Sequence, residues 1–218
     1  FPWSYRDLVK TLMKLEKWDE ALATCNGIVN LVQEYPWVYV QMGNIFLKKN
    51  NSDEAISCFH KSCELRGWYF PKDKNYQFTQ DNFSYRIPTW ESHLQSLVDR
   101  VGLQILEIGN NQGMSTCWML DKLLTDDSAK LVCVDTEFAE ECHSNIVRTG
   151  AGGKVRKLEG DIHEHLTNLE SNFYDLINIQ DKRKFPKHIK QNAELAWLLL
   201  KVDGLLIFND YQRHNPNY

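Results

Sequence analysis

A short stretch with two glycines, Gly109 and Gly113, has the composition of a ligand-binding loop. It follows the apolar run 104–108 and precedes the segment 114–124, in which apolar residues recur at helical spacing. Gly109 permits a tight turn, Gly113 lets the helix begin close to a ligand, and the first amides of that helix can donate to it. The spacing is G-x-x-x-G, whereas a loop that cradles a pyrophosphate reads G-x-G-x-x-G. The stretch therefore predicts a ligand without a pyrophosphate and disfavours a dehydrogenase.

Acidic residues stand at or just after the ends of three successive apolar runs. Glu107 can orient the glycine loop or accept from an ammonium group, and Asp135 can accept from both hydroxyls of a ribose. Asp161 and the apolar Ile162 after it stand where an adenine could be hydrogen-bonded and sandwiched. One such acid is more often a helix cap or a solvated charge. Three at successive strand ends favour a cofactor site, because ligands of open α/β sheets bind at the carboxyl ends of the strands.

These positions and their neighbours form one set of candidate residues. The candidate cofactor-binding residues are Glu107, Gly109, Asn110, Gly113, Ser115, Asp135, Thr136, Asp161 and Ile162.

Polar residues also follow the last two apolar runs, where acid–base chemistry would be expected. Gln180 comes after the fourth run, and Asn209 and Asp210 come after the fifth. Asp210 is the candidate general base, while Gln180 and Asn209 can orient groups by hydrogen bonds but cannot take a proton. The basic run 182–184 could bind an acidic substrate, although a short charge run is more often a solvated turn.

Short apolar runs alternate with helical stretches from residue 103 onward, which is typical of a parallel sheet with crossover helices. The sequence predicts an α/β domain over residues 103–218, with a Rossmann-like, doubly wound and mostly parallel sheet. We expect strands at 104–108, 130–135, 154–158, 176–179 and 205–208, and helices near 114–124, 138–148, 162–170 and 187–200.

The first 66 residues repeat at an offset of 34. The segment Asp19–Ala21 returns as Asp53–Ala55, and apolar residues recur at three- and four-residue steps on two segments of each unit. The pattern predicts two all-α helical hairpins, and it resembles the tetratricopeptide repeat family. Two hairpins bury little apolar surface alone, so we expect further repeats upstream or a cap from the next domain.

Residues 67–102 are interpreted as an aromatic linker followed by a capping helix. Rings recur through the linker, from Trp68 to Tyr85. They could pack as an ordered connector or form a lid or wall for a substrate, since long loops are often functional.

Composition and charge exclude several kinds of partner. The formal net charge is −4 without a basic patch, so nucleic acid is not an expected partner. No apolar run approaches the roughly 20 residues of a membrane helix, so no membrane partner is expected either. The six cysteines form no CxxC pair, which favours reduced core thiols and a cytoplasmic protein. The chain begins at Phe1 without a signal-peptide pattern, so we expect it to be part of a longer protein.

Together these residues resemble class I S-adenosylmethionine-dependent methyltransferases, and more closely the branch fused behind tetratricopeptide repeats. The resemblance covers roughly residues 76–211 and is carried by the stretches 78–84, 87–90, 107–118 and 200–211. It implies S-adenosylmethionine as the cofactor and methyl transfer to an oxygen of a sugar or another small hydroxylated metabolite, a small-molecule or glycan acceptor. Among the candidates, the positions that match the family are Glu107, Gly109, Gly113, Asp135 and Asp161.

The sequence departs from this branch where a base or a metal would be held. Members usually carry a carboxylate, a glycine and a histidine after the fourth strand, and two aspartates after the fifth. Gln180 and Asn209 stand there instead, and neither supplies the negative charge that Mg²⁺ favours. We therefore assign no metal ligand, although a divalent metal stays open. The family fold has seven strands, and the five expected here lead us to expect missing sequence.

Two alternatives to an enzyme acting alone remain open. The helical repeats could dock a protein partner, with the α/β domain as a degenerate, non-catalytic remnant. The chain could also be the accessory part of a larger biosynthetic enzyme and methylate a product that a neighbour hands over.

Overall fold

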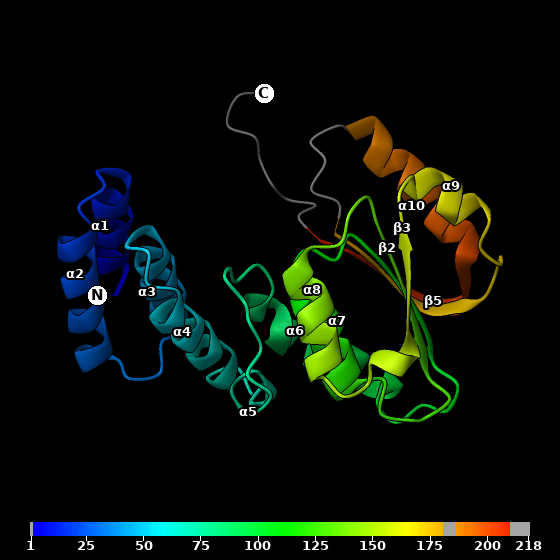
Figure 1. Ribbon diagram of the computed structural model, residues 1–218, viewed down its shortest axis with the longest axis horizontal. Coiled ribbons are helices and arrows are strands. Elements are labelled where there is room, and N and C mark those ends of the chain that lie inside the picture. Colours follow the sequence, from blue (N-terminus) through cyan, green and yellow to red (C-terminus); the bar gives the residue numbers. More distant parts are fainter. Residues whose placement is uncertain (1, 181–185, 210–218) are drawn as a thin grey trace. The chain divides into compact units, whose positions relative to one another are not determined.

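The computed structural model describes residues 2–180 and 186–209, and it divides into two compact units, Phe1–His93 and Leu94–Tyr218. The first unit is helical, and the second is an α/β sheet with helices (Figure 1). The aromatic linker up to residue 93 thus belongs to the first unit. No helix in the described ranges combines the length and apolarity that crossing a membrane requires.

The first unit begins with four helices that follow the expected repeat. They are α1 Pro2–Lys14, α2 Trp18–Leu31, α3 Pro36–Lys48 and α4 Ser52–Glu64. The starts of α1 and α3, and of α2 and α4, are each 34 residues apart (36 − 2 and 52 − 18). The two predicted hairpins are present, and their assignment to the tetratricopeptide family stays a prediction.

Small residues let the paired helices of the first unit approach closely. Ala21 and Ala55, which occupy equivalent positions in the repeat, are both fully buried. A Cβ added at Gly43 of α3 would lie 2.5 Å from the ring of Phe59 in α4. A side chain at position 43 would therefore push the α3–α4 pair apart.

The linker of the first unit is built around buried rings. Trp68, Tyr76, Phe78 and Phe83 are fully buried, and Trp90 is 4% exposed. The Phe83 and Trp90 ring centroids lie 4.8 Å apart in an edge-to-face arrangement. The short helices α5 Phe70–Asp73, η1 Ser84–Arg86 and α6 Ile87–Leu94 lie within or beside this cluster in the sequence. The rings thus form an ordered apolar cluster within the first unit.

The second unit contains one sheet in which every pairing is parallel. Its strands are β1 Gln104–Ile108, β2 Lys130–Asp135, β3 Val155–Glu159, β4 Tyr174–Ile179 and β5 Leu200–Phe208, in the order β3-β2-β1-β4-β5. The chain runs outward from β1 to β3 and then returns to the other side of β1 through β4. This reversal makes the sheet doubly wound, as predicted.

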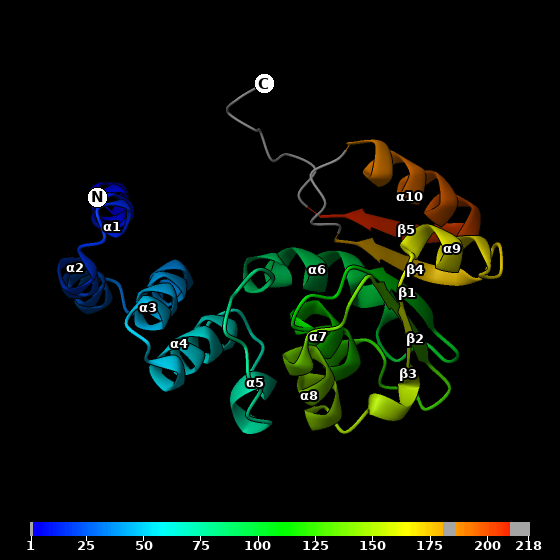
Figure 2. The same ribbon diagram turned by 45° about the horizontal axis from the view of Figure 1, so that its top comes forward.

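Helices cover both faces of the sheet. They are α7 Met114–Lys122, α8 Glu140–Arg148, α9 Ile162–Thr167 and α10 Pro186–Leu199. Figures 1 and 2 show α7 and α8 on one face and α9 and α10 on the other. An apolar core on the second face includes Leu106, Ile108, Val134 and Ile177 from the strands, with Leu166 from α9.

The sequence misplaced some boundaries of these elements. β3 begins one residue later than expected, and β5 begins at Leu200 rather than at residue 205. The pair Asp203-Gly204 had the character of a turn, yet it lies inside β5, where the register with β4 shifts between Tyr174 and Leu176. Asp203 has a positive φ of 62°. The sequence analysis therefore began the strand after this irregularity, although the irregularity lies inside β5.

Candidate cofactor-binding site

The carboxyl ends of the central strands bring the glycine loop and the two amide candidates to one edge of the sheet. The backbone N–H of Gly109 donates to Val134 at 2.9 Å, that of Gln180 donates to Ile108 at 2.7 Å, and that of Asn209 donates to Ile179 at 2.9 Å. The parallel ladder thus continues one residue beyond β1, β4 and β5. Because β1 lies between β2 and β4, this edge is the switch point of the sheet.

The loop after β1 has a backbone that only certain residues adopt without strain. Gly109 and Gly113 have φ values of 83° and 78°, and Asn111 has a φ of 56°. The left-handed region is open to glycine and is tolerated by asparagine. The N–H of Gly113 closes the loop by donating to the carbonyl of Asn110 at 2.8 Å.

Gly113 also allows two helices to meet. A Cβ at this position would lie 3.0 Å from Sγ and 3.5 Å from Cα of Cys142 in α8. Gly113 is the N-cap of α7 and has no side chain with which to cap it. The first-turn amides of α7 are therefore directed toward the loop side, where the helix dipole also favours negative charge.

Glu107 is a fully buried carboxylate that accepts from four protein donors. The hydroxyls of Ser115 and Thr116 donate to it, the latter at 2.6 Å. The side-chain amides of Asn110 and Asn178 donate at 2.8 and 2.9 Å. A carboxylate has about four acceptor positions, so protein groups occupy the capacity of Glu107. This carboxylate ties the glycine loop and the first turn of α7 to β1 and β4.

Burial raises the pKa of Glu107 to about 7. Removal from water disfavours the charged form, and the negative charge of Asp135 acts in the same direction. The hydrogen bonds from Ser115, Thr116 and Asn178 lower the pKa and offset part of this rise. Glu107 therefore changes its charge near neutral pH, within a network that holds the loop.

Asp135 ends β2 and is partly exposed. The backbone N–H of Asn110 donates to Asp135 Oδ2 at 2.7 Å, and that of Thr136 donates to Oδ1 at 2.8 Å. The Thr136 hydroxyl also donates to Oδ1, at 3.4 Å, and because a carboxylate has about four acceptor positions these bonds leave capacity for a ligand. Asp135 is thus both a tie to the glycine loop and a carboxylate that can accept from a ligand.

Asp161 and Ile162 lie after β3, as expected, and have structural partners there. Asp161 is exposed and is the N-cap of α9, accepting from the N–H of Glu164 at 3.0 Å. Ile162 is 3% exposed and belongs to the core beneath α9 and α10. Little of the Ile162 surface is therefore available to an adenine.

The two amide candidates for chemistry have different surroundings. Gln180 is 5% exposed, and its Oε1 lies 3.4 Å from the Ser115 hydroxyl, beside the start of α7. Asn209 is partly exposed, and its Nδ2 donates to Asn178. The candidate base Asp210 lies outside the described residues, as does the basic run 182–184.

Asn178 is a functional candidate that the sequence analysis missed. It is fully buried in β4, where it pairs in register with Glu107 of β1. The signal was present in the sequence, because Asn178 is a lone amide inside the apolar run 176–179. A buried amide in such a run requires partners, and the sequence does not show which ones.

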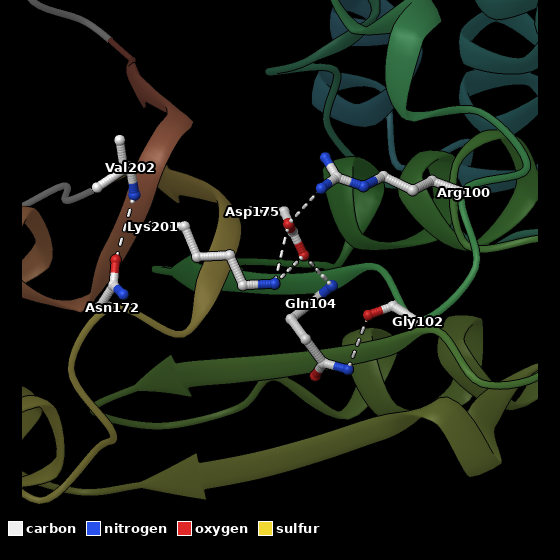
Figure 3. A network of polar contacts seen from close by, with 7 residues as sticks. All are labelled: Arg100, Gly102, Gln104, Asn172, Asp175, Lys201 and Val202. Carbon is white, nitrogen blue, oxygen red and sulfur yellow. Dashed lines mark hydrogen bonds and ion pairs between the residues drawn. The ribbon is translucent and has the colours of Figure 1, made fainter.

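A second polar network, around Asp175, lies near the amino ends of the strands (Figure 3). Asp175 is 3% exposed and accepts from Lys201 at 3.0 Å and from the N–H of Gln104 at 2.9 Å, and it forms an ion pair with Arg100 at 3.1 Å. Lys201 is in β5 and Arg100 precedes β1. This network holds the strands together at the end away from the glycine loop.

The described residues offer neither a metal cluster nor a buried histidine base beside the loop. No three His, Cys, Asp or Glu side chains in these ranges gather in a way that could hold a metal ion. His143 is exposed, with Nδ1 2.7 Å from Lys157 Nζ, and His165 Nε2 lies 2.9 Å from the carbonyl of Glu159. All six cysteines are buried free thiols.

Comparison with known families links this sheet to methyltransferases. Residues 106–211 match the family described as "Methyltransferase domain". The match runs from within β1 through the end of β5, and it supports a methyltransferase domain in this part of the chain. No curated protein matches the chain.

Solved structures with a similar sheet include proteins described as methyltransferases. TomG, an O-methyltransferase of tomaymycin synthesis from Streptomyces achromogenes solved with S-adenosylmethionine, is 24% identical over 42% of this chain and 43% of its own, with a TM-score of 0.35. A methyltransferase from Geobacter sulfurreducens with bound S-adenosylhomocysteine is 16% identical over 54% of this chain and 44% of its own, with a TM-score of 0.41. One from Thiobacillus denitrificans, with the same ligand, is 17% identical over 55% and 46%, with a TM-score of 0.38. The chain spans about half the length of the solved structures it matches.

Proposed function

We propose that the α/β unit binds S-adenosylmethionine and is a methyltransferase. The observation that carries this proposal is the partly exposed Asp135 at the end of β2, held beside the glycine loop by the N–H of Asn110. The family match over residues 106–211 supports the same activity.

The donors and acceptors of the site fit this cofactor. Asp135 has acceptor positions for the two hydroxyls of a ribose. Asn110 is 1% exposed, and its buried Oδ1 has no hydrogen-bond partner among the described residues. A buried acceptor of this kind gains a bond from a ligand donor, such as the ammonium group of the cofactor's methionine part. The G-x-x-x-G loop suits a ligand without a pyrophosphate.

We assign the remaining cofactor contacts to the backbone of the loop and to the strand ends. Gly109 and Gly113 allow close approach, and Ser115 and Thr136 orient the two carboxylates by their hydrogen bonds. Asp161 is proposed to reach the adenine from the start of α9. Glu107 acts through the loop and does not itself contact the cofactor, because its acceptor positions face protein donors.

The acceptor is proposed to be a hydroxyl of a sugar or another small metabolite. S-adenosylmethionine, when bound, supplies a methyl group that is already activated for transfer. The residues at the ends of β4 and β5 have to align the acceptor oxygen, and alignment contributes much of the rate in such a reaction. Gln180 and Asn209 are assigned to positioning and Asp210 to proton removal.

Calorimetric titration of the protein with S-adenosylmethionine and S-adenosylhomocysteine tests this proposal. We expect micromolar dissociation constants, corresponding to about −8 kcal/mol. The Gly109→Trp change fills the loop, and Asp135→Ala removes the proposed ribose contact, so both changes should abolish binding. A folded protein that binds neither ligand contradicts the methyltransferase proposal.

A second candidate function rests on the helical unit. A groove formed by α1, the start of α2 and α3 is lined by Met13, Trp18 and Leu47, and Lys14 and Lys48 also line it. Apolar side chains with lysines suit an acidic peptide segment of a protein partner. In this alternative the chain is a tetratricopeptide scaffold with a degenerate methyltransferase domain. It becomes the leading candidate if the titration detects no cofactor binding.

A further inference from the structure

Asn178 connects residues on the two strands that flank β4. Its Nδ2 donates to Glu107 Oε1 at 2.9 Å, and its Oδ1 accepts from Asn209 Nδ2 at 2.5 Å. Glu107 in turn accepts from Asn110, Ser115 and Thr116 of the loop and α7. A continuous chain of hydrogen bonds therefore runs from the buried residues of the glycine loop to the partly exposed Asn209 at the end of β5.

Glu107 fixes the direction of every bond in this chain. Above its pKa of about 7, Glu107 is an ionised carboxylate that only accepts hydrogen bonds, so the amide nitrogen of Asn178 must face it. The opposite orientation would place the Asn178 oxygen against a carboxylate oxygen and its nitrogen against the Asn209 nitrogen. The contact between the two oxygens is strongly unfavourable, because Asn178 and Glu107 are fully buried and neither side chain can bond to water instead.

The same reasoning extends to Asn209. Since the Asn178 oxygen faces Asn209, Asn209 must direct its Nδ2 toward Asn178. The Asn209 Oδ1 is therefore directed away from Asn178. The Glu107 carboxylate therefore holds the amide of Asn209 in one of its two orientations, acting through the two hydrogen bonds of Asn178.

We propose that Asn178 is a positioning residue that fixes Asn209 with its Oδ1 as the hydrogen-bond acceptor for the substrate, which must carry a hydroxyl or N–H donor there. This inference rests on the proposed methyltransferase function, whose acceptor hydroxyl meets the requirement. An ether or carbonyl at the same place would meet an oxygen and be rejected, since sites built around one hydrogen-bond polarity discriminate strongly against the other.

Side-chain amide NMR of the ¹⁵N-labelled full chain tests the chain of bonds without any ligand. Loss of one pair of signals in Asn209→Asp assigns the two Asn209 Nδ2 protons. In the wild type we expect the Asn209 Nδ2 proton that bonds to Asn178 to exchange with water about tenfold or more slowly than a solvated amide, because this partly buried bond must open first. Asn178→Leu should remove this protection.

The matched control is Asn192→Leu, which removes a side chain that is also buried, 2% exposed, but on α10. It should leave Asn209 protected. If Asn178→Leu does not fold, Asn178→Thr keeps a small polar side chain in the strand and should show the same loss. Protection of Asn209 that persists in a folded Asn178 variant overturns the inference.

Titration with S-adenosylhomocysteine adds a functional readout. Asn178→Leu should weaken binding about tenfold, because Glu107 loses one of its donors and holds the loop less firmly. Asn192→Leu should change the affinity less than about twofold, as expected for a side chain outside the network. Unchanged affinity in Asn178→Leu contradicts the link to the loop. A wild type that binds no ligand yet protects Asn209 contradicts the proposed function and supports the fixed orientation of the amide.

Discussion

The backbone N–H of Asn110 donates to Asp135 Oδ2 at 2.7 Å and so joins the glycine loop after β1 to the end of β2. This bond determines how the carboxylate is presented, because the N–H of Thr136 holds the other oxygen at 2.8 Å. Asp135 is thus fixed by backbone donors on both oxygens while part of it stays exposed. A carboxylate held in this way is prepared for a ligand with two adjacent hydroxyls.

The assignment of Asp135 to a ribose predicts a specific coupling. Wild-type protein should bind 2′-deoxy-S-adenosylhomocysteine about tenfold more weakly than S-adenosylhomocysteine, because a hydrogen bond to a charged group is lost. Asp135→Asn should bind both ligands weakly and discriminate between them less than about threefold. Calorimetry of both ligands with both proteins gives the double-mutant cycle. Glu170→Gln serves as the control, because it also removes one negative charge, from an exposed side chain.

The buried Glu107 predicts how stability depends on pH. Its pKa of about 7 lies above the value of 4.5 for a solvated glutamate. Below pH 4.5 the folded and unfolded states are both protonated; between 4.5 and 7 only the folded state keeps the proton, so stability falls as pH rises. The stability of the wild type relative to Glu107→Gln should therefore fall by about 3 kcal/mol between pH 4.5 and 7 and stay constant above.

Urea unfolding of both proteins at several pH values measures this difference. Groups that titrate alike in the two proteins cancel, so the remaining slope belongs to Glu107 and its network. A difference that is flat from pH 4.5 to 7 would show that the hydrogen bonds to Glu107 fully compensate its burial.

Gly113 predicts a measurable cost of contact between α7 and α8. Gly113→Ala introduces strain at a φ of 78° and a Cβ 3.0 Å from Cys142 Sγ. Gly150 has a similar φ of 76° and no atom within 4 Å of such a Cβ, so Gly150→Ala introduces the strain alone. We expect Gly113→Ala to lower the free energy of unfolding by about 1 kcal/mol more than Gly150→Ala. Equal losses in urea unfolding would leave the contact with Cys142 without an energetic role.

The sheet was predictable because its strands are short apolar runs that end in polar residues. β1 and β2 have the predicted bounds, since the apolar runs end at Gly109 and at Asp135. β5 was less clear because Asp203 and Gly204 have turn character, and only pairing with β4 keeps them in the strand. The local sequence pattern identified the strands, whereas the start of the irregular strand β5 depends on its pairing with β4.

The site was predictable only as far as the residues at the strand ends. The glycine loop and Asp135 meet at the switch point because parallel strands bring their carboxyl ends to one edge. The bonds from Asn178 to Glu107 and Asn209 join residues 71 and 31 positions apart. No local pattern shows such partners. The sequence also did not show that Ile162 packs into the apolar core, because it does not fix which face of α9 lies against the sheet.

Asp175 predicts that one buried carboxylate stabilises the end of the sheet remote from the glycine loop. Asp175→Asn keeps an acceptor for the N–H of Gln104 but removes the charge that Lys201 and Arg100 share, so we expect a loss of about 2 kcal/mol in urea unfolding. Lys201→Met and Arg100→Met should each cost about 1 kcal/mol or less, because Lys201 and Arg100 are 37% and 50% exposed and each variant keeps the other cation.

Raising the salt to 1 M should narrow the difference in stability between the wild type and Asp175→Asn, since salt screens the exposed cation of each ion pair. The affinity for S-adenosylhomocysteine should change less than about twofold in Asp175→Asn. The bonds of Asp175 lie at the other end of the sheet from the glycine loop, and changes at distant sites are usually independent. A large loss of affinity with little loss of stability would instead make Asp175 part of the binding site and contradict its structural role.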